Sequence, residues 1–72
     1  MMKFFRGWYL GAEIFAFITT TEINGPVEYI LFVYQYGYMG QRVPLKSKAY
    51  KTLTGAIKAM YRAFPDVEWR EE

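Results

Sequence analysis

The segment EYILFVYQYGY, Glu28 to Tyr38, is rich in aromatic and β-branched residues and predicts a β-strand. Successive side chains of a strand point to opposite faces of its sheet. One face of this strand would carry Tyr29, Leu31, Val33 and Gln35. The other face would carry Ile30, Phe32, Tyr34, Tyr36 and Tyr38. Because both faces are largely apolar, the strand requires cover on both sides.

A single amphipathic helix is predicted downstream, from Thr52 to Phe64. Its apolar residues recur with the helical period of about 3.6 residues. They are Leu53, Ala56, Ile57, Met60, Tyr61 and Phe64. Thr52 is the predicted N-cap, and Pro65 ends the helix because proline disfavours the helical conformation of the residue before it. One helix covers one face of a small sheet, so the second face is expected to lack helical cover.

Two further strands are predicted around the central one. Trp8 to Thr21 is again rich in aromatic and β-branched residues and predicts a long first strand with a bend or bulge at Gly11. The turn sequence EINGP, Glu22 to Pro26, would join it to the central strand as a hairpin. Gln41 to Leu45 predicts a short third strand, which Pro44 restricts to a sheet edge.

The two ends of the chain leave alternatives open. Met1 to Gly7 predicts either a lead-in strand or an arm. Asp66 to Glu72 alternates Val67 and Trp69 with charged residues, which indicates either a fourth short strand or a segment folded back on Trp69. The predicted fold is an α+β single domain over residues 1–72, in which a three-stranded antiparallel meander carries one amphipathic helix packed on one face.

The composition indicates a folded protein without catalytic machinery. Of the 72 residues, 53% are hydrophobic and 21% aromatic, which excludes a disordered chain. The chain has no His and no Cys, and Ser47 is its only serine. The usual residues of acid–base catalysis, nucleophilic attack and thiolate or imidazole metal binding are therefore missing. We expect a protein that is not an enzyme, with no cofactor, no metal and no small-molecule substrate.

The same composition bears on location. No uncharged stretch approaches the roughly 18 residues that a membrane-spanning helix needs. The apolar run near the N-terminus contains Glu13 and no small-residue cleavage pattern follows it, which argues against a signal peptide. Together with the absence of cysteine, these features predict a cytoplasmic protein without a membrane partner.

The second sheet face is the strongest functional feature of the sequence. If the helix covers Leu10, Ile14, Ala16, Leu31 and Val33, five rings fall on the opposite side of the sheet. These rings are Phe15, Phe17, Phe32, Tyr34 and Tyr36. Three hypotheses compete. Phe4, Phe5 and Trp69 could fold across the rings as internal cover. The rings could bind a protein, because aromatic residues are enriched at interface cores. They could also stack on the bases of a single-stranded nucleic acid.

Charge is segregated along the chain although the net charge is only +2. Between Glu28 and Asp66 there is no acidic residue, but there are six cations. They are Arg42, Lys46, Lys48, Lys51, Lys58 and Arg62. Lysines of the predicted loop and the polar side of the helix would together form a basic strip, which is either a solvated surface or a site for nucleic acid. Nucleic-acid binding through this strip is the alternative function.

The layout of three strands, a threonine-capped helix and a terminal Pro-Asp-Val segment resembles small accessory domains, among them the three-stranded DNA-binding arms of integrases. A compact, cysteine-free and aromatic-rich chain of this size is also similar to phage accessory proteins that inhibit a larger host protein. The leading prediction is a non-enzymatic binding module that associates through its aromatic sheet face with a second copy, as a homodimer, or with a larger target protein.

Overall fold

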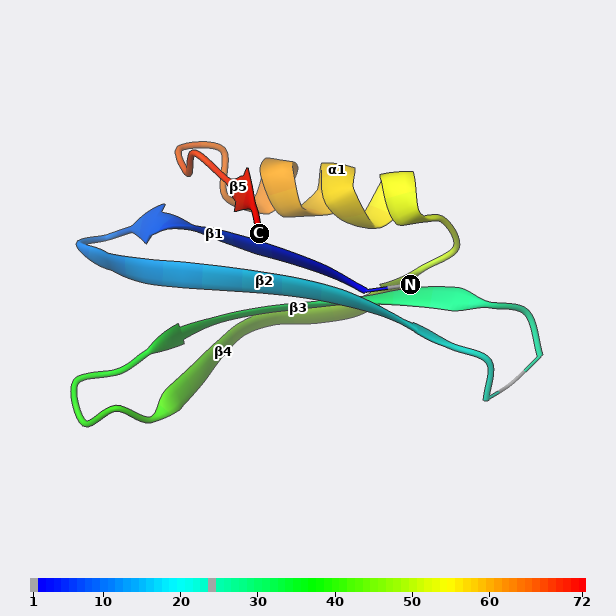
Figure 1. Ribbon diagram of the computed structural model, residues 1–72, viewed down its shortest axis with the longest axis horizontal. Coiled ribbons are helices and arrows are strands. Elements are labelled where there is room, and N and C mark those ends of the chain that lie inside the picture. The colour runs from blue at the N-terminus through cyan, green and yellow to red at the C-terminus, as the bar shows by residue number, and fades with distance from the viewer. Residues whose placement is uncertain (1, 24) are drawn as a thin grey trace.

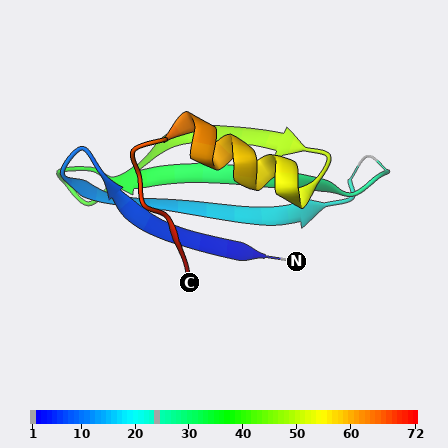
Figure 2. The ribbon, with the colours of Figure 1, turned by 90° about the horizontal axis from the view of Figure 1, so that it is seen from above.

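The computed structural model describes residues 2–23 and 25–72 (Figure 1). A five-stranded antiparallel sheet has the strand order β4-β3-β2-β1-β5. Its strands are β1 (Lys3–Tyr9), β2 (Ala12–Thr21), β3 (Glu28–Tyr36), β4 (Arg42–Tyr50) and β5 (Arg70–Glu71). The helix α1 (Leu53–Ala63) lies across one face of this sheet (Figure 2). The predicted α+β class is confirmed, with one helix on one face of the sheet and the C-terminal tail as a short further strand. The expected number of strands was one too few, because β1 is a separate strand.

The segment predicted as one long first strand reverses direction at Gly11 and forms a hairpin. Strand β1 pairs with β2 from Lys3 opposite Ile18 to Tyr9 opposite Ala12. Leu10 and Gly11 form the turn, with φ angles of 53° and 80°. Two-residue turns with positive φ match the twist of paired antiparallel strands. Leucine rarely adopts positive φ, so the sequence indicated a bend here and not a reversal.

The new hairpin settles the state of the N-terminal segment. Residues 3–7 belong to a strand and not to an arm, while Met1 lies outside the described residues. The predicted hairpin between β2 and β3 is confirmed, with Thr21 opposite Glu28 next to the turn. Asn24 of the EINGP turn also lies outside the described residues.

Strand β4 is longer than the predicted third strand, because it continues beyond Leu45 to Tyr50. It lies at the edge of the sheet, as Pro44 predicted. Lys46 and Lys48, expected in a loop, are therefore strand residues. The pattern missed this extension because alternating lysine and small residues carry little strand signal.

The helix is confirmed at both ends. Oγ1 of Thr52 accepts a hydrogen bond from the Gly55 backbone N–H at 2.9 Å, which caps the N-terminus. At the other end the Phe64 N–H donates to the Met60 carbonyl oxygen at 3.2 Å, and Pro65 follows.

The core lies between α1 and the sheet. The most deeply buried side chains there are small or aliphatic. They are Ile14, Ala16, Ile18, Leu31 and Val33 from the sheet and Ala56 and Met60 from the helix. Leu10, expected beneath the helix, is 84% exposed because it occupies the turn between β1 and β2. We call the sheet face beneath α1 the covered face.

The C-terminal tail covers the β1 side of this core. It both folds back on Trp69 and forms a short strand, so the two alternatives predicted for it are both confirmed. Val67 and Trp69 are buried, and β5 then pairs with β1. Figure 2 shows the tail turning back from the end of α1 across β1. A Cβ built on Gly7 would run into Val67 Cγ1 and approach the Glu68 carbonyl oxygen to 3.3 Å. Glycine at position 7 therefore lets the tail cross β1 closely.

Candidate protein-binding face

The sheet face opposite α1 carries alternate residues of the four long strands. The register sets Phe17 opposite Phe32 and Phe15 opposite Tyr34, so the predicted rings share one surface. Phe4 joins them, because it lies opposite Phe17. We call this surface the aromatic face. Its rings are Phe4, Phe15, Phe17, Phe32, Tyr34 and Tyr36.

The hypothesis that Phe4, Phe5 and Trp69 cover these rings from within was wrong. Phe4 is a member of the aromatic face and extends it. Phe5 and Trp69 belong to the buried core cluster beneath the helix, and the Trp69 ring meets Phe64 edge-on at 6.3 Å between centroids. The alternation of β1 is the reason, since adjacent residues 4 and 5 point to opposite faces. The helix and the tail both lie on the covered side of the sheet (Figure 1).

The rings contact one another along the sheet. Phe15 stacks on Tyr34 with 5.3 Å between ring centroids and an interplanar angle of 19°. It also meets the edge of Tyr36 at 5.5 Å. Phe17 stacks on Phe32 at 5.9 Å. Such pairs add about 0.5–1.5 kcal/mol each beyond the area that they bury, so the face has a defined shape before any partner binds.

The five predicted rings differ in how much of each is accessible. Phe15 is buried among its neighbours and exposes 8% of its surface, whereas Phe32 exposes 37% and Tyr36 exposes 49%. Phe17 and Tyr34 are half-buried. Phe32 and Tyr36 therefore offer the most surface to a partner, and Phe15 supports them from within.

Two arginines lie over rings at one end of the aromatic face. The guanidinium carbon of Arg42 is 4.7 Å from the Tyr34 ring centroid, and that of Arg6 is 5.4 Å from the Phe15 centroid. Arg6 Nε also lies 3.8 Å from Glu13 Oε2. These cation–π contacts hold the charged groups against the rings. Among the described residues, no cation lies over the row formed by Phe4, Phe17 and Phe32.

A shallow hollow of about 410 Å³ lies beside that uncovered row. Phe4, Phe17 and Phe32 form its apolar side. Strand β4 contributes Arg42, Pro44, Lys46 and Ser47 to the lining. The hollow therefore accommodates an apolar group next to positive charge.

The six cations predicted as a basic strip do not share one surface. Arg42 lies on the aromatic face. The register pairs Lys46 with Val33 and Lys48 with Leu31, so both belong to the covered side of the sheet edge, where Lys46 also borders the hollow. The remaining three are Lys51, which follows β4, and Lys58 and Arg62, which are exposed on α1. None of the six forms an ion pair within residues 2–23 and 25–72.

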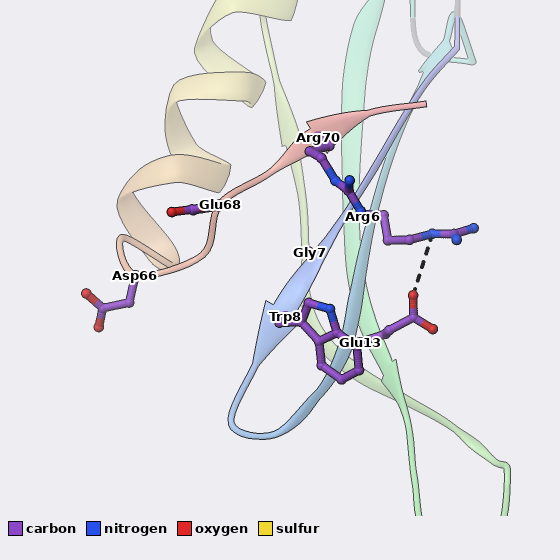
Figure 3. A pocket seen from close by; sticks show the side chains of 7 residues that line it. All are labelled: Arg6, Gly7, Trp8, Glu13, Asp66, Glu68 and Arg70. Carbon is purple, nitrogen blue, oxygen red and sulfur yellow. Dashed lines mark ion pairs between the residues drawn. The ribbon is translucent and has the colours of Figure 1, made fainter.

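A second hollow, of about 390 Å³, lies at the opposite edge of the sheet, where the tail passes β1. In Figure 3, Glu13 points toward Arg6, whereas Asp66 and Glu68 point away from that pair. The carboxylates that line this second hollow therefore do not point toward a common centre. The described part of the chain holds no cluster of three or more acidic, His or Cys residues that could bind a metal.

Sequence reasoning missed several members of the aromatic face and its hollow. Sequence alone predicted only internal cover for Phe4, and it carried no signal that Pro44 and Ser47 line a hollow. The alternation in KFFRGWY, Lys3 to Tyr9, was the available signal for Phe4, because it separates Phe4, Arg6 and Trp8 from the buried Phe5.

No family model, no curated protein and no solved structure matches this chain. Within the described residues, no helix is long and apolar enough to cross a membrane.

Proposed function

We propose that this protein binds another protein through its aromatic face and does not catalyse a reaction. The observation that carries the proposal is the absence of cover on this face by any described element of the chain. Phe32 and Tyr36 remain partly exposed at its surface. Large aromatic side chains are the residues on which interface energies most often depend.

The arrangement of charge supports the same proposal. Apolar rings occupy the middle of the face, while Arg6, Glu13 and Arg42 lie toward one end of it. Interfaces between proteins commonly have such an apolar centre and a polar rim. The partner is a second copy of this chain or a larger target protein, which the binding would inhibit or assist. The cysteine-free chain is compatible with the cytoplasmic location that we include in the proposal.

The first test is the solution mass of the chain by light scattering over a range of concentrations. We expect a dimer at twice the monomer mass of 8.5 kDa, and a monomer for the variant F32S/Y36S. Tyr61→Ser is the matched control, because Tyr61 exposes 47% of its surface but lies on α1. A dimer that survives F32S/Y36S and dissociates with Tyr61→Ser would contradict the proposal.

A larger target requires a second test. A photo-crosslinking residue at position 32 is expected to join the chain to a defined protein in its native cell, whereas the same residue at position 61 is not. Equal crosslinking from both positions would mean that the aromatic face has no special role in binding.

Nucleic-acid binding is the second candidate, because Arg42 and Lys46 line the hollow beside rings that could stack on bases. Salt separates the two functions. Phosphate contacts weaken steeply as salt rises, whereas an apolar interface persists. Binding of a single-stranded oligonucleotide that is lost at high salt and in the variant R42A/K46A would favour this candidate over the first.

A further inference from the structure

We propose a second binding site on the free edge of β4, where an acidic, extended segment of a protein partner adds to the sheet as a further strand. This site is distinct from the aromatic face, although the two adjoin at the hollow beside Pro44. The inference goes beyond the proposed function because it assigns the conformation and the charge of the bound segment.

The backbone of β4 is available on its outer side. Strand β3 pairs with one side of β4, and within residues 2–23 and 25–72 no strand follows on the other side. Among the described residues, no hydrogen bond outside the β3 ladder involves residues 42–50. An unpaired strand edge exposes N–H and C=O groups that can pair with another strand. Pro44 has no N–H to donate, so residues 45–50 form the better half of this edge.

The charge of the edge selects the segment that can bind. Arg42, Lys46 and Lys48 give β4 three cations, and none of them has an ion-pair partner among the described residues. We call these three residues the basic edge. No acidic residue occurs between Glu28 and Asp66. A bound strand with carboxylates on the covered side would lie next to Lys46 and Lys48, and opposite charges on adjacent strands stabilise their pairing.

The same charges disfavour a second copy at this site. An antiparallel pair of two β4 strands centred on Ser47 would set Lys46 of each copy opposite Lys48 of the other. Like charges directly opposite on paired strands are destabilising, and lysines on an edge strand commonly prevent such pairing. The basic edge therefore favours binding of an acidic strand over pairing with β4 of a second copy.

The two sides of the edge give the bound segment an alternating pattern. On the covered side it meets Lys46 and Lys48. On the aromatic side it meets Ser47 at the hollow, where Phe32 lies opposite in the register. The pairing of β4 with β3 is irregular at Leu45, so regular alternation begins at Lys46. Because successive side chains of a strand alternate between faces, the matching sequence alternates acidic and apolar residues.

A synthetic peptide of about eight alternating Glu and Val residues, within the usual length of a strand, is the probe for this site. Backbone amide shifts of the full chain are followed by NMR during titration, together with amide hydrogen exchange. We expect the largest shifts and new protection in residues 45–50. A peptide of alternating Lys and Val is expected to bind at least about tenfold more weakly, because it sets like charges against the basic edge. A Glu/Val peptide that is N-methylated at alternate residues, on the side that pairs, is expected not to bind.

Two charge-reversal variants separate strand addition from general electrostatic attraction. K46E/K48E changes the basic edge, whereas K58E/R62E makes the same change of net charge on α1. We expect K46E/K48E to exchange the preference of the chain from the Glu/Val peptide to the Lys/Val peptide, and K58E/R62E to keep the original preference. Circular dichroism of both variants verifies that they fold.

Four outcomes would overturn the proposal. In the first two, the Glu/Val and Lys/Val peptides bind equally well, or the N-methylated peptide still binds. In the third, K46E/K48E and K58E/R62E weaken binding of the Glu/Val peptide equally. In the fourth, an oligothymidylate binds the basic edge and the Glu/Val peptide does not. The variant Tyr36→Ser distinguishes this site from the aromatic face, because Tyr36 does not line the hollow. It is expected to weaken association through the aromatic face and to leave peptide binding at β4 unchanged.

Discussion

The two faces of the sheet are built from the same four strands, but one face is buried beneath the helix and the other stays partly exposed. On the covered face, Leu31 and Val33 are almost completely buried, and they present short aliphatic side chains to the helix. On the aromatic face, their neighbours Phe32 and Tyr34 contact other rings along the sheet and keep part of their surface accessible.

This difference explains why only one face carries the helix. A floor of Ile, Leu, Val and Ala side chains lets Ala56 and Met60 of α1 approach the sheet closely. Rings that stand on the other face contact one another and would hold a helix further away. The alternation within each strand therefore separates residues that stabilise the monomer from residues that are available to a partner.

The strongest test of this contrast compares two adjacent residues on opposite faces. Leu31→Ala is expected to destabilise the chain by about 2–5 kcal/mol, the usual cost of truncating a buried leucine. Phe32→Ala is expected to cost less, roughly 1.5–3 kcal/mol, because Phe32 keeps 37% of its surface exposed and loses about 1–2 kcal/mol of partial burial and about 0.5–1.5 kcal/mol of ring stacking. Chemical denaturation followed by circular dichroism measures both free energies of unfolding.

The total stability of a chain of this size is roughly 4–11 kcal/mol, so Leu31→Ala could leave too little folded protein to measure. Ile18→Val, which should cost about 0.5–1.5 kcal/mol, then replaces it and is compared with the conservative change Phe32→Leu. If the Phe32 variants are as unstable as those at Leu31 and Ile18, the rings belong to the core and the aromatic face is not free to bind.

A second test concerns the tail, which exists only on the covered side. Gly7→Ala is expected to cost about 1–3 kcal/mol, as overpacking does, because the new methyl group would meet Val67. In a chain that already carries Val67→Ala, the added cost of Gly7→Ala should fall, since the clashing methyl groups are gone. Denaturation of the four chains of this cycle gives the coupling energy. A coupling near zero would show that the tail does not press on β1.

The helix could be predicted because its signals are local. The cap at Thr52, the apolar period and the stop at Pro65 all lie within one short segment and agree with each other. The aromatic face was also foreseeable in part, since alternation alone assigns Phe32, Tyr34 and Tyr36 to one side of a strand.

What the sequence concealed depends on long-range pairing. The chain reverses at Leu10 and Gly11, a pair that lacks the usual Asn-Gly signature of a tight turn. The reason for Gly7 appears only once Val67 crosses β1. The extension of β4 to Tyr50 likewise depends on pairing with β3, because its own lysines give a weak strand pattern.

The variant with the smallest expected effect tests whether α1 can be destabilised without a change in the aromatic face. Thr52→Ala removes the oxygen that accepts from the Gly55 N–H and should cost about 1 kcal/mol, the usual value of an N-cap. Thr54→Ala is the matched control, because Thr54 is exposed in the first turn of α1 and makes no side-chain hydrogen bond among those of the described residues. Since α1 does not touch the aromatic face, the NMR ring resonances of Phe32 and Tyr36 should stay unchanged in both variants. If Thr52→Ala moves those resonances as strongly as the helical amides, the two faces are mechanically coupled, and a partner bound to one would alter the stability of the other.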